Sequence, residues 1–210
     1  SLQWKCDLQK VNALQVSDNV FDVLSDNIGS LSPKVRDLLS IASCMGNTFS
    51  HELLEKVFND DEHFDESLEL ALSSGWIIVD DSNSAEGRSY RFLHDKMQQA
   101  IYTFLLGEML NKVHYDIGCH LEMSSESLDH QHLLECVNHL NIGEKYVKDK
   151  NFLGRLNLEA SNYAKKSADF ESALKYIKKS MELSSVNNSV ENSVLMIKQR
   201  AECEHLCNHS

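Results

Sequence analysis

Glycine and proline are scarce in this chain, and their scarcity limits the folds that the sequence can form. Eight glycines and one proline stand among 210 residues, which is about a third of their average usage. Because these residues dominate turns and interrupt helices, we expect a mainly α-helical protein. The glycines are also too widely spaced for a GxxxxGK[ST], GxGxxG or GxSxG motif. The phosphate-binding loops and the nucleophile elbow of three large enzyme classes are therefore excluded.

Cysteine usage and hydropathy indicate where such a protein would reside. The longest uninterrupted apolar stretch, residues 76–79, is far shorter than the ~20 residues of a membrane span, and residues 1–5 do not follow the plan of a signal peptide. The six cysteines are widely spaced rather than arranged in a dense framework. We therefore expect a cytoplasmic protein with reduced thiols that does not associate with membranes. Since the sequence does not begin with methionine, we also expect it to be a piece of a longer protein.

The negative charge is concentrated in the first half of the chain. The formal net charge is −12, and residues 1–13, 14–123 and 124–210 contribute +1, −12 and −1. Composition also changes near residues 123–127, which have the sequence MSSES and are rich in serine. These changes predict a linker at 1–13, a first domain at 14–123 and a second at 124–210.

The first domain is expected to contain helices followed by a β-hairpin. Apolar residues at helical spacing predict helices over 17–28, 33–45, 50–60 and 62–74, and a further helix from Asp95. Ser32 followed by Pro33, and Ser50, are typical helix N-terminal residues. The β-rich runs 76–79 and 89–93 predict a hairpin. This order is the plan of a winged-helix domain, although an α+β module of another family fits the same pattern.

The second domain alternates helical stripes with short polar breaks. Within 152–184, small and aromatic residues fall where a tetratricopeptide helix pair places them. One such unit is clear, and residues 191–206 would form the first helix of the next. Because one repeat cannot bury its own apolar face, we expect a helical, tetratricopeptide-like repeat region.

Residues 91–102, with the sequence RFLHDKMQQAIY, carry a resemblance to a known group of proteins. The string resembles the FLHDRxQQAxY signature of STAND-type multidomain signalling ATPases, including multi-sensor hybrid histidine kinases and serine/threonine kinases. Residues 18–20, 42–49 and 156–160 occur in the same order as in such proteins. The similarity spans about residues 14–184 and implies a winged helix plus the start of helical repeats.

The resemblance implies a non-catalytic regulatory fragment of a signal-transduction protein. ATP or ADP would be bound by an upstream ATPase domain of the same chain, and sensor or kinase modules would follow downstream. His94 would sense the phosphate of bound ADP, and Asp95 would be the helix N-cap that orients it. From the residues alone, an alternative remains: Asp95 only caps the helix, and His94 makes a local hydrogen bond.

Other candidate sites are weaker. The segment 50–53 is superficially similar to the phosphorylation box of a histidine kinase, but capping by Ser50 explains it better. Two groups have partial metal-ligand spacing, and we expect neither to bind a metal; they are Cys203, His205, Cys207 and His209, and His130, His132, Cys136 and His139.

Nucleic-acid binding is not expected from the first domain. Its candidate recognition helix, 50–60, holds one lysine among several acidic residues, and phosphate groups would be repelled. The lysines near residues 165–179 are expected to be a solvated helix face. The sequence thus predicts a fragment without enzymatic activity that relays the nucleotide state of an upstream ATPase domain. The alternative is an adaptor whose repeats bind a partner protein.

Overall fold

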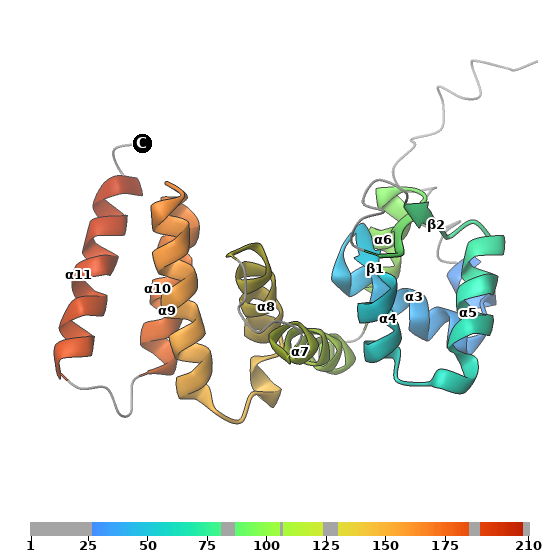
Figure 1. Ribbon diagram of the computed structural model, residues 1–210, viewed down its shortest axis with the longest axis horizontal. Coiled ribbons are helices and arrows are strands. Elements are labelled where there is room, and N and C mark those ends of the chain that lie inside the picture. Colours follow the sequence, from blue (N-terminus) through green and yellow to red (C-terminus); the bar gives the residue numbers. More distant parts are fainter. Residues whose placement is uncertain (1–26, 81–86, 106, 124–129, 185–189, 208–210) are drawn as a thin grey trace, which may run out of the picture. The chain divides into compact units, whose positions relative to one another are not determined.

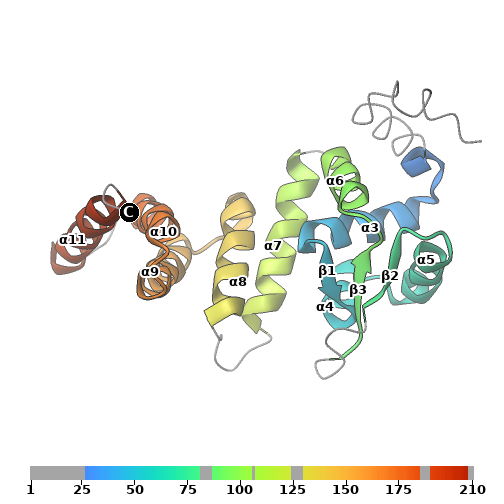
Figure 2. The same ribbon diagram turned by 90° about the horizontal axis from the view of Figure 1, so that it is seen from above.

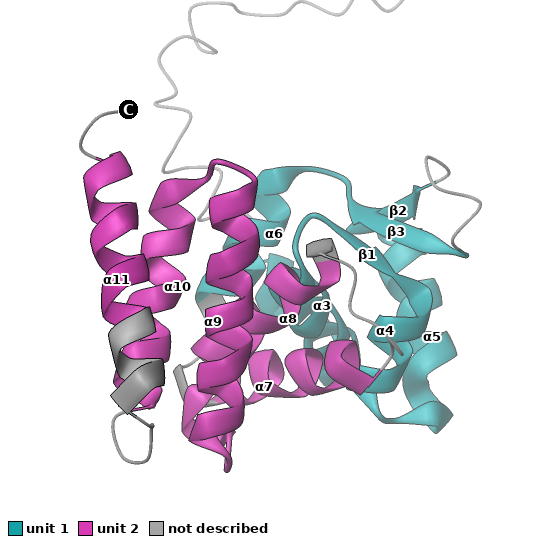
Figure 3. Cartoon of the chain, turned by 60° about the vertical axis from the view of Figure 1, so that its left-hand side comes forward, with its two compact units in different colours: residues 1–106 teal, residues 107–210 magenta. Residues whose placement is uncertain are grey.

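The computed structural model describes residues 27–80, 87–105, 107–123, 130–184 and 190–207. The chain divides into two compact units, residues 1–106 and 107–210 (Figure 3). The described part is mainly helical with a small three-stranded antiparallel sheet, as the scarcity of glycine and proline predicts. The linker expected at 1–13 and most of the helix expected at 17–28 lie outside the described residues.

The helices of the first unit begin and end close to their predicted limits. They are α3 (Pro33–Met45), α4 (His51–Phe58), α5 (Asp61–Ser73) and α6 (Asp95–Phe104) (Figure 1). The side chain of Ser32 accepts a hydrogen bond from the Val35 N–H at 3.4 Å, so the predicted cap of α3 is confirmed. The helix α3 ends before Gly46, whose φ of 116° favours glycine.

The sheet contains the predicted hairpin and one strand that was not predicted. Strands β2 (Ile77–Asp80) and β3 (Ser89–Phe92) pair antiparallel. Strand β1 (Thr48–Ser50) pairs with the other edge of β3, which gives the order β1-β3-β2 (Figure 2). With only three residues and a partner far along the chain, β1 has no local hydrophobic alternation to reveal it.

One face of this sheet forms part of the core of the first unit. The rings of Phe49 and Phe92 lie 5.7 Å apart between centroids, and Tyr90 lies 6.1 Å from Phe49. These rings belong to the same buried cluster as Leu38 and Leu54 of the helices. The core therefore fixes which face of β3 points inward.

The second unit is a succession of helices. It contains α7 (Gly107–Met123), α8 (His130–Ile142), the 3-10 turn η1 (Glu144–Tyr146), α9 (Lys150–Lys166), α10 (Phe170–Leu183) and α11 (Val190–Cys207). Helix α7 belongs to this unit, although its residues were assigned to the first domain from the change in charge near residue 123. The reason is packing: a Cβ added at Gly118 of α7 would lie 2.7 Å from the Leu140 side chain of α8.

Small residues lie at the contact between α9 and α10. The Ser180 hydroxyl donates to the Gly154 carbonyl at 2.8 Å, and the Ser161 hydroxyl donates to the Ala173 carbonyl at 2.8 Å. Ser161 also accepts a hydrogen bond from the Gln199 side chain of α11 at 2.9 Å. Helix α11 covers the predicted range 191–206. Among the described helices, none has the length and the apolar character that crossing a bilayer requires.

Candidate functional site

The segment that carries the resemblance forms a sharp corner between a strand and a helix. Strand β3 ends at Phe92, and α6 begins at Asp95. Between them the backbone of His94 is extended, with φ −142° and ψ 141°. The Leu93 N–H donates to the Trp76 carbonyl at 3.2 Å, and the Phe92 N–H donates to the Asn47 carbonyl at 3.0 Å. These bonds hold the corner against the neighbouring strand β2 and the segment that precedes β1.

Of the two predicted site residues, His94 lies at the expected corner and Asp95 does not take the expected N-cap position. His94, rather than Asp95, takes the N-cap position of α6, and its carbonyl accepts from the Met97 N–H at 2.9 Å. The predicted role of Asp95 as the N-cap is therefore wrong. Asp95 is the first residue inside the helix, where its negative charge still complements the helix dipole. The His94 side chain is exposed and makes no hydrogen bond within the described part of the chain.

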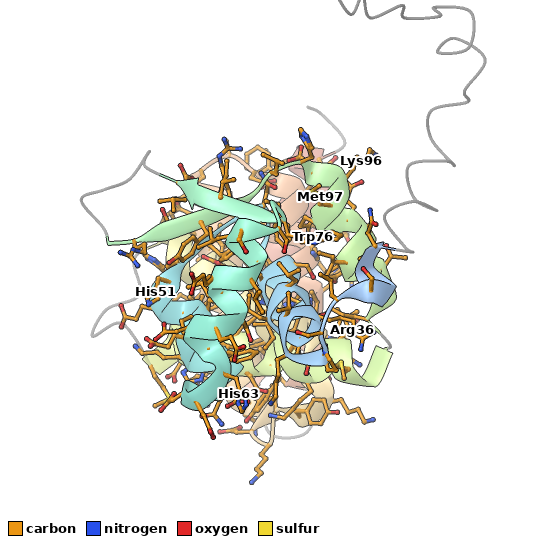
Figure 4. The ribbon with its side chains drawn as sticks, turned by 90° about the vertical axis from the view of Figure 1, so that its right-hand side faces the viewer. Arg36, His51, His63, Trp76, Lys96 and Met97 are labelled. Carbon is orange, nitrogen blue, oxygen red and sulfur yellow. The ribbon has the colours of Figure 1, made fainter. Side chains whose placement is uncertain are left out.

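Three cationic residues lie along the segment 88–96, which contains strand β3 and the start of α6. Arg88, Arg91 and Lys96 are exposed, and Figure 4 shows Lys96 at the surface of α6, beside Met97. Lys96 donates to the Gln99 side chain at 3.2 Å. Within the described residues, none of these three cations forms an ion pair.

Other lysines of the first unit are paired with carboxylates. Lys34 pairs with Asp60, and Lys56 pairs with Glu52 at 2.6 Å. The Lys34 and His63 side chains lower the pKa of Asp60 to about 2. The cations of the 88–96 segment thus differ from these lysines in being open to an outside anion. Sequence analysis did not single out Arg91 as a candidate binding residue. Its position between the core residues Tyr90 and Phe92 of β3 was the available signal, because side chains alternate between the two faces of a strand.

Ser50 caps α4, as predicted. Its hydroxyl oxygen accepts from the Leu53 N–H at 3.2 Å. The neighbouring His51 is half-buried, with Nδ1 3.1 Å from the Tyr90 hydroxyl and its ring centroid 5.3 Å from that of Phe64. His51 therefore contributes to the edge of the core.

The histidines and cysteines of α8 do not converge on one point. His132 is exposed, whereas Cys136 is buried and its thiol donates to the Gly118 carbonyl at 3.4 Å. His139 points to His114 of α7 instead. The described residues contain no group of three or more potential ligands that could hold a metal ion. Cys203, His205 and Cys207 lie on α11, while His209 and the side chain of His130 lie outside the described residues.

Sequence analysis missed the contact between His114 and His139. The two Nδ1 atoms are 2.9 Å apart, and the residues are 4% and 7% exposed. Burial lowers the pKa of both imidazoles to about 4. In the sequence, each histidine lies on the apolar stripe of its own helix. This pattern predicts that each is buried, but it does not show that the two stripes face each other.

Comparison with known proteins finds one distant relationship. The chain is 22% identical over 233 aligned positions to a protein of Dictyostelium discoideum named "Hybrid signal transduction histidine kinase G". The alignment covers 86% of this chain but 7% of that protein. No family model matches the chain, and no solved structure matches it. The chain thus spans a small part of the length of that protein, and the similarity supports a distant relationship to a signal-transduction kinase.

Proposed function

We propose that the chain is a regulatory region of a larger signalling protein, in which the first unit responds to the nucleotide state of an upstream ATPase domain. The second unit passes this response to helical repeats and to sensor or kinase modules. The distant similarity to a hybrid histidine kinase supports a place in signal transduction. It covers most of this chain and a small part of the relative, as expected for one region of a multidomain protein.

The order of elements supports a winged helix in the first unit. A helix, a short strand, two helices and a hairpin follow one another as α3, β1, α4, α5, β2 and β3. Because β1 pairs with the outer edge of the hairpin, the sheet is tied to the helices through the core. The loop at the hairpin tip, 81–86, lies outside the described residues.

The observation that carries the proposal is the exposed His94 at the corner between β3 and α6. Its imidazole is open to solvent, and Arg91 and Lys96 lie close to it in the sequence. Cationic and imidazole N–H groups are good donors to phosphate oxygens. A nucleotide phosphate presented to this corner by a neighbouring ATPase domain would meet donors of this kind. ATP or ADP is then a ligand of the parent protein, with this unit sensing which one is bound.

A relay of this kind needs two arrangements of the first unit, only one of which contacts the phosphate. A ligand shifts such an equilibrium only by its difference in affinity for the two states. Contact of His94 with the phosphate of ADP would supply this difference. Exchange of ADP for ATP would then release the first unit and change what the repeats present.

The charges of the first unit support a protein partner rather than nucleic acid. In a winged helix, the helix before the hairpin is the one that enters a DNA groove, and here that helix is α5 rather than the predicted 50–60. Its exposed side chains include Asp61, Glu62, Asp65, Glu66 and Glu69, which would repel a phosphate backbone.

The paired helices α9 and α10 support tetratricopeptide-like repeats in the second unit. Their contact is made by small residues, and α11 packs beside them through the Gln199–Ser161 hydrogen bond. We propose no catalytic residue and no resident cofactor in this region. We further propose that the protein acts in the cytoplasm.

Substitution of His94 in the full-length parent protein tests the relay. We expect His94→Ala to accelerate ADP release and to raise the resting output, because the state that holds ADP loses a phosphate contact. The measurements are the dissociation rate of labelled ADP and the signalling output without stimulus. His132→Ala, which removes an exposed imidazole from α8, is the matched control.

The same experiment separates the proposal from an adaptor function. An adaptor whose repeats bind a partner would keep both its ADP retention and its resting output when His94 is replaced. Unchanged values of both would therefore remove the relay and leave the adaptor.

A further inference from the structure

Two buried histidines join the first two helices of the second unit. His114 of α7 and His139 of α8 lie with their Nδ1 atoms 2.9 Å apart and their ring centroids 4.9 Å apart. An imidazole nitrogen accepts a hydrogen bond only when it carries no proton. One ring must therefore donate from Nδ1 while the other accepts at Nδ1. A second proton at this contact removes the acceptor and places two donors face to face.

The surroundings of the pair leave little room for it to rearrange. The residues are 4% and 7% exposed. One turn along α7 from His114, a Cβ at Gly118 would lie 2.7 Å from the Leu140 side chain. The Cys136 thiol donates to the Gly118 carbonyl at 3.4 Å. Close packing at Gly118 thus holds α7 and α8 together one turn away from the two rings.

Two titratable groups of α8 lie near the pair in the sequence, and burial favours the neutral form of both. Glu135 and Cys136 lie one turn before His139, and burial raises the pKa of both, that of Cys136 to about 12. On α7 the positions one turn from His114 are Leu110, Asn111, Ile117 and Gly118, which do not titrate.

On η1, Glu144 pairs with Lys179 at 2.6 Å and with Lys150 of α9 at 3.6 Å, and Tyr146 stacks near Tyr115 of α7. A partner of either Nε2 atom leaves the argument unchanged, because the shared hydrogen bond uses Nδ1 of both rings.

We propose that the His114–His139 pair is an acid-sensitive latch that holds α7 on α8. Uptake of a proton breaks the Nδ1–Nδ1 bond and puts a positive charge between the two helices, so that they separate. Helix α7 is the first helix of the second unit and follows α6 after two residues. The latch therefore sets whether α7, the helix through which the chain enters the second unit, is packed on α8. This proposal does not depend on the function proposed for the first unit.

The direction of the pH dependence follows from the two states of the imidazoles. In the closed state their pKa is lowered to about 4, by burial and, for His139, also by the charge of His114. In the open state it returns to the usual value of about 6.5. The open state binds more protons between these values, so the latch is fully effective above about pH 7 and weakens as the pH falls toward 4.

Titration of the 210-residue chain by NMR tests the latch. We expect the imidazole signals of His114 and His139 to titrate well below the usual histidine pKa of about 6.5. We also expect the opening constant of α7 and α8, measured by amide hydrogen exchange, to rise on the order of a hundredfold between pH 7 and pH 5. The exchange of α9 and α10, corrected for the intrinsic effect of pH, serves as the internal reference.

Two variants complete the test. His139→Gln keeps a side-chain hydrogen-bonding group that does not titrate, so it should reduce the pH dependence of α7–α8 opening at least tenfold. His132→Gln on the same helix should leave that dependence unchanged. The latch is refuted if His114 and His139 of the unmodified chain titrate near the usual histidine pKa of about 6.5. It is equally refuted if His139→Gln folds and opens with the pH dependence of the unmodified chain.

Discussion

Asn157 shows how a single buried polar side chain can fix the packing of two helices. It is fully buried on α9, and its amide exchanges two hydrogen bonds with Asn141 of α8, at 2.8 and 2.9 Å. It also donates to the Leu153 carbonyl at 2.9 Å. Because buried amides are costly to leave unpaired, this reciprocal contact selects one register of α8 against α9.

Replacing Asn157 should therefore cost stability. We expect Asn157→Ala to lower the free energy of unfolding by about 1–3 kcal/mol, because it removes these bonds and leaves the Asn141 amide with fewer partners. Urea denaturation of the 210-residue chain measures the change. Asn162→Ala, at an exposed position of the same helix, should be neutral or slightly stabilising, since alanine favours the helix. Equal losses in both variants would contradict this role of Asn157.

At the same scale, the sequence predicts local contacts better than distant ones. The caps by Ser32 and Ser50 involve N–H groups three residues away, so a short window contains both partners. Asp95 was mistaken for a cap because its residue type suits that position, while the extended backbone of His94 is set by its neighbours in the fold. The contact of His114 with His139 depends on how two helices meet, which no local pattern records.

Among the elements, α7 and α8 approach each other most closely where glycine permits it. A Cβ at Gly143, just after α8, would lie 2.6 Å from the backbone nitrogen of Tyr115 in α7. A backbone atom cannot swing aside as a side chain does. The spacing between these two elements is thus set by the absence of a side chain at residue 143.

Gly143→Ala should push α7 away from α8. We expect a loss of about 1–3 kcal/mol in the free energy of unfolding, typical of overpacking, with faster amide exchange in α7. Gly29→Ala is a suitable control, because nothing lies within 4 Å of a Cβ at that position. Similar stability of the two variants would show that the backbone near Tyr115 adapts freely.

The elements that the sequence predicts are those with a pattern in their own residues. Helices and the hairpin have periodic patterns or paired β-rich runs, and these predicted α3, α4, α5, β2 and β3. Strand β1 exists only because β3 offers it an edge. Charge misplaced the division of the chain near residue 123, because charge lies on surfaces and compact units are defined by packing.

At the scale of the whole molecule, each compact unit has buried residues of its own. The principal core cluster contains residues of the first unit alone, from Ile28 to Ile101. Helix pairs such as α9 and α10 form the interior of the second. We therefore expect each unit to respond to damage in its own core.

Leu38→Ala provides a direct test of this independence. Leu38 is fully buried in the first unit, and its truncation should cost about 2–5 kcal/mol there. Hydrogen exchange followed by mass spectrometry should show faster opening of α3 and α5 and unchanged protection of α9 and α10. A loss of protection throughout both units would show instead that they unfold as one.

The Ser161 hydroxyl of α9 links three helices of the second unit. It donates a hydrogen bond to a carbonyl of α10 and accepts one from the Gln199 amide of α11. One oxygen atom of α9 is therefore hydrogen-bonded to both of the helices that follow it. Rotation of α11 about its long axis would either break the Gln199–Ser161 hydrogen bond or move α9 and α10 together with α11. A rotation of α11 is therefore coupled, through a single hydroxyl group, to the contact between α9 and α10.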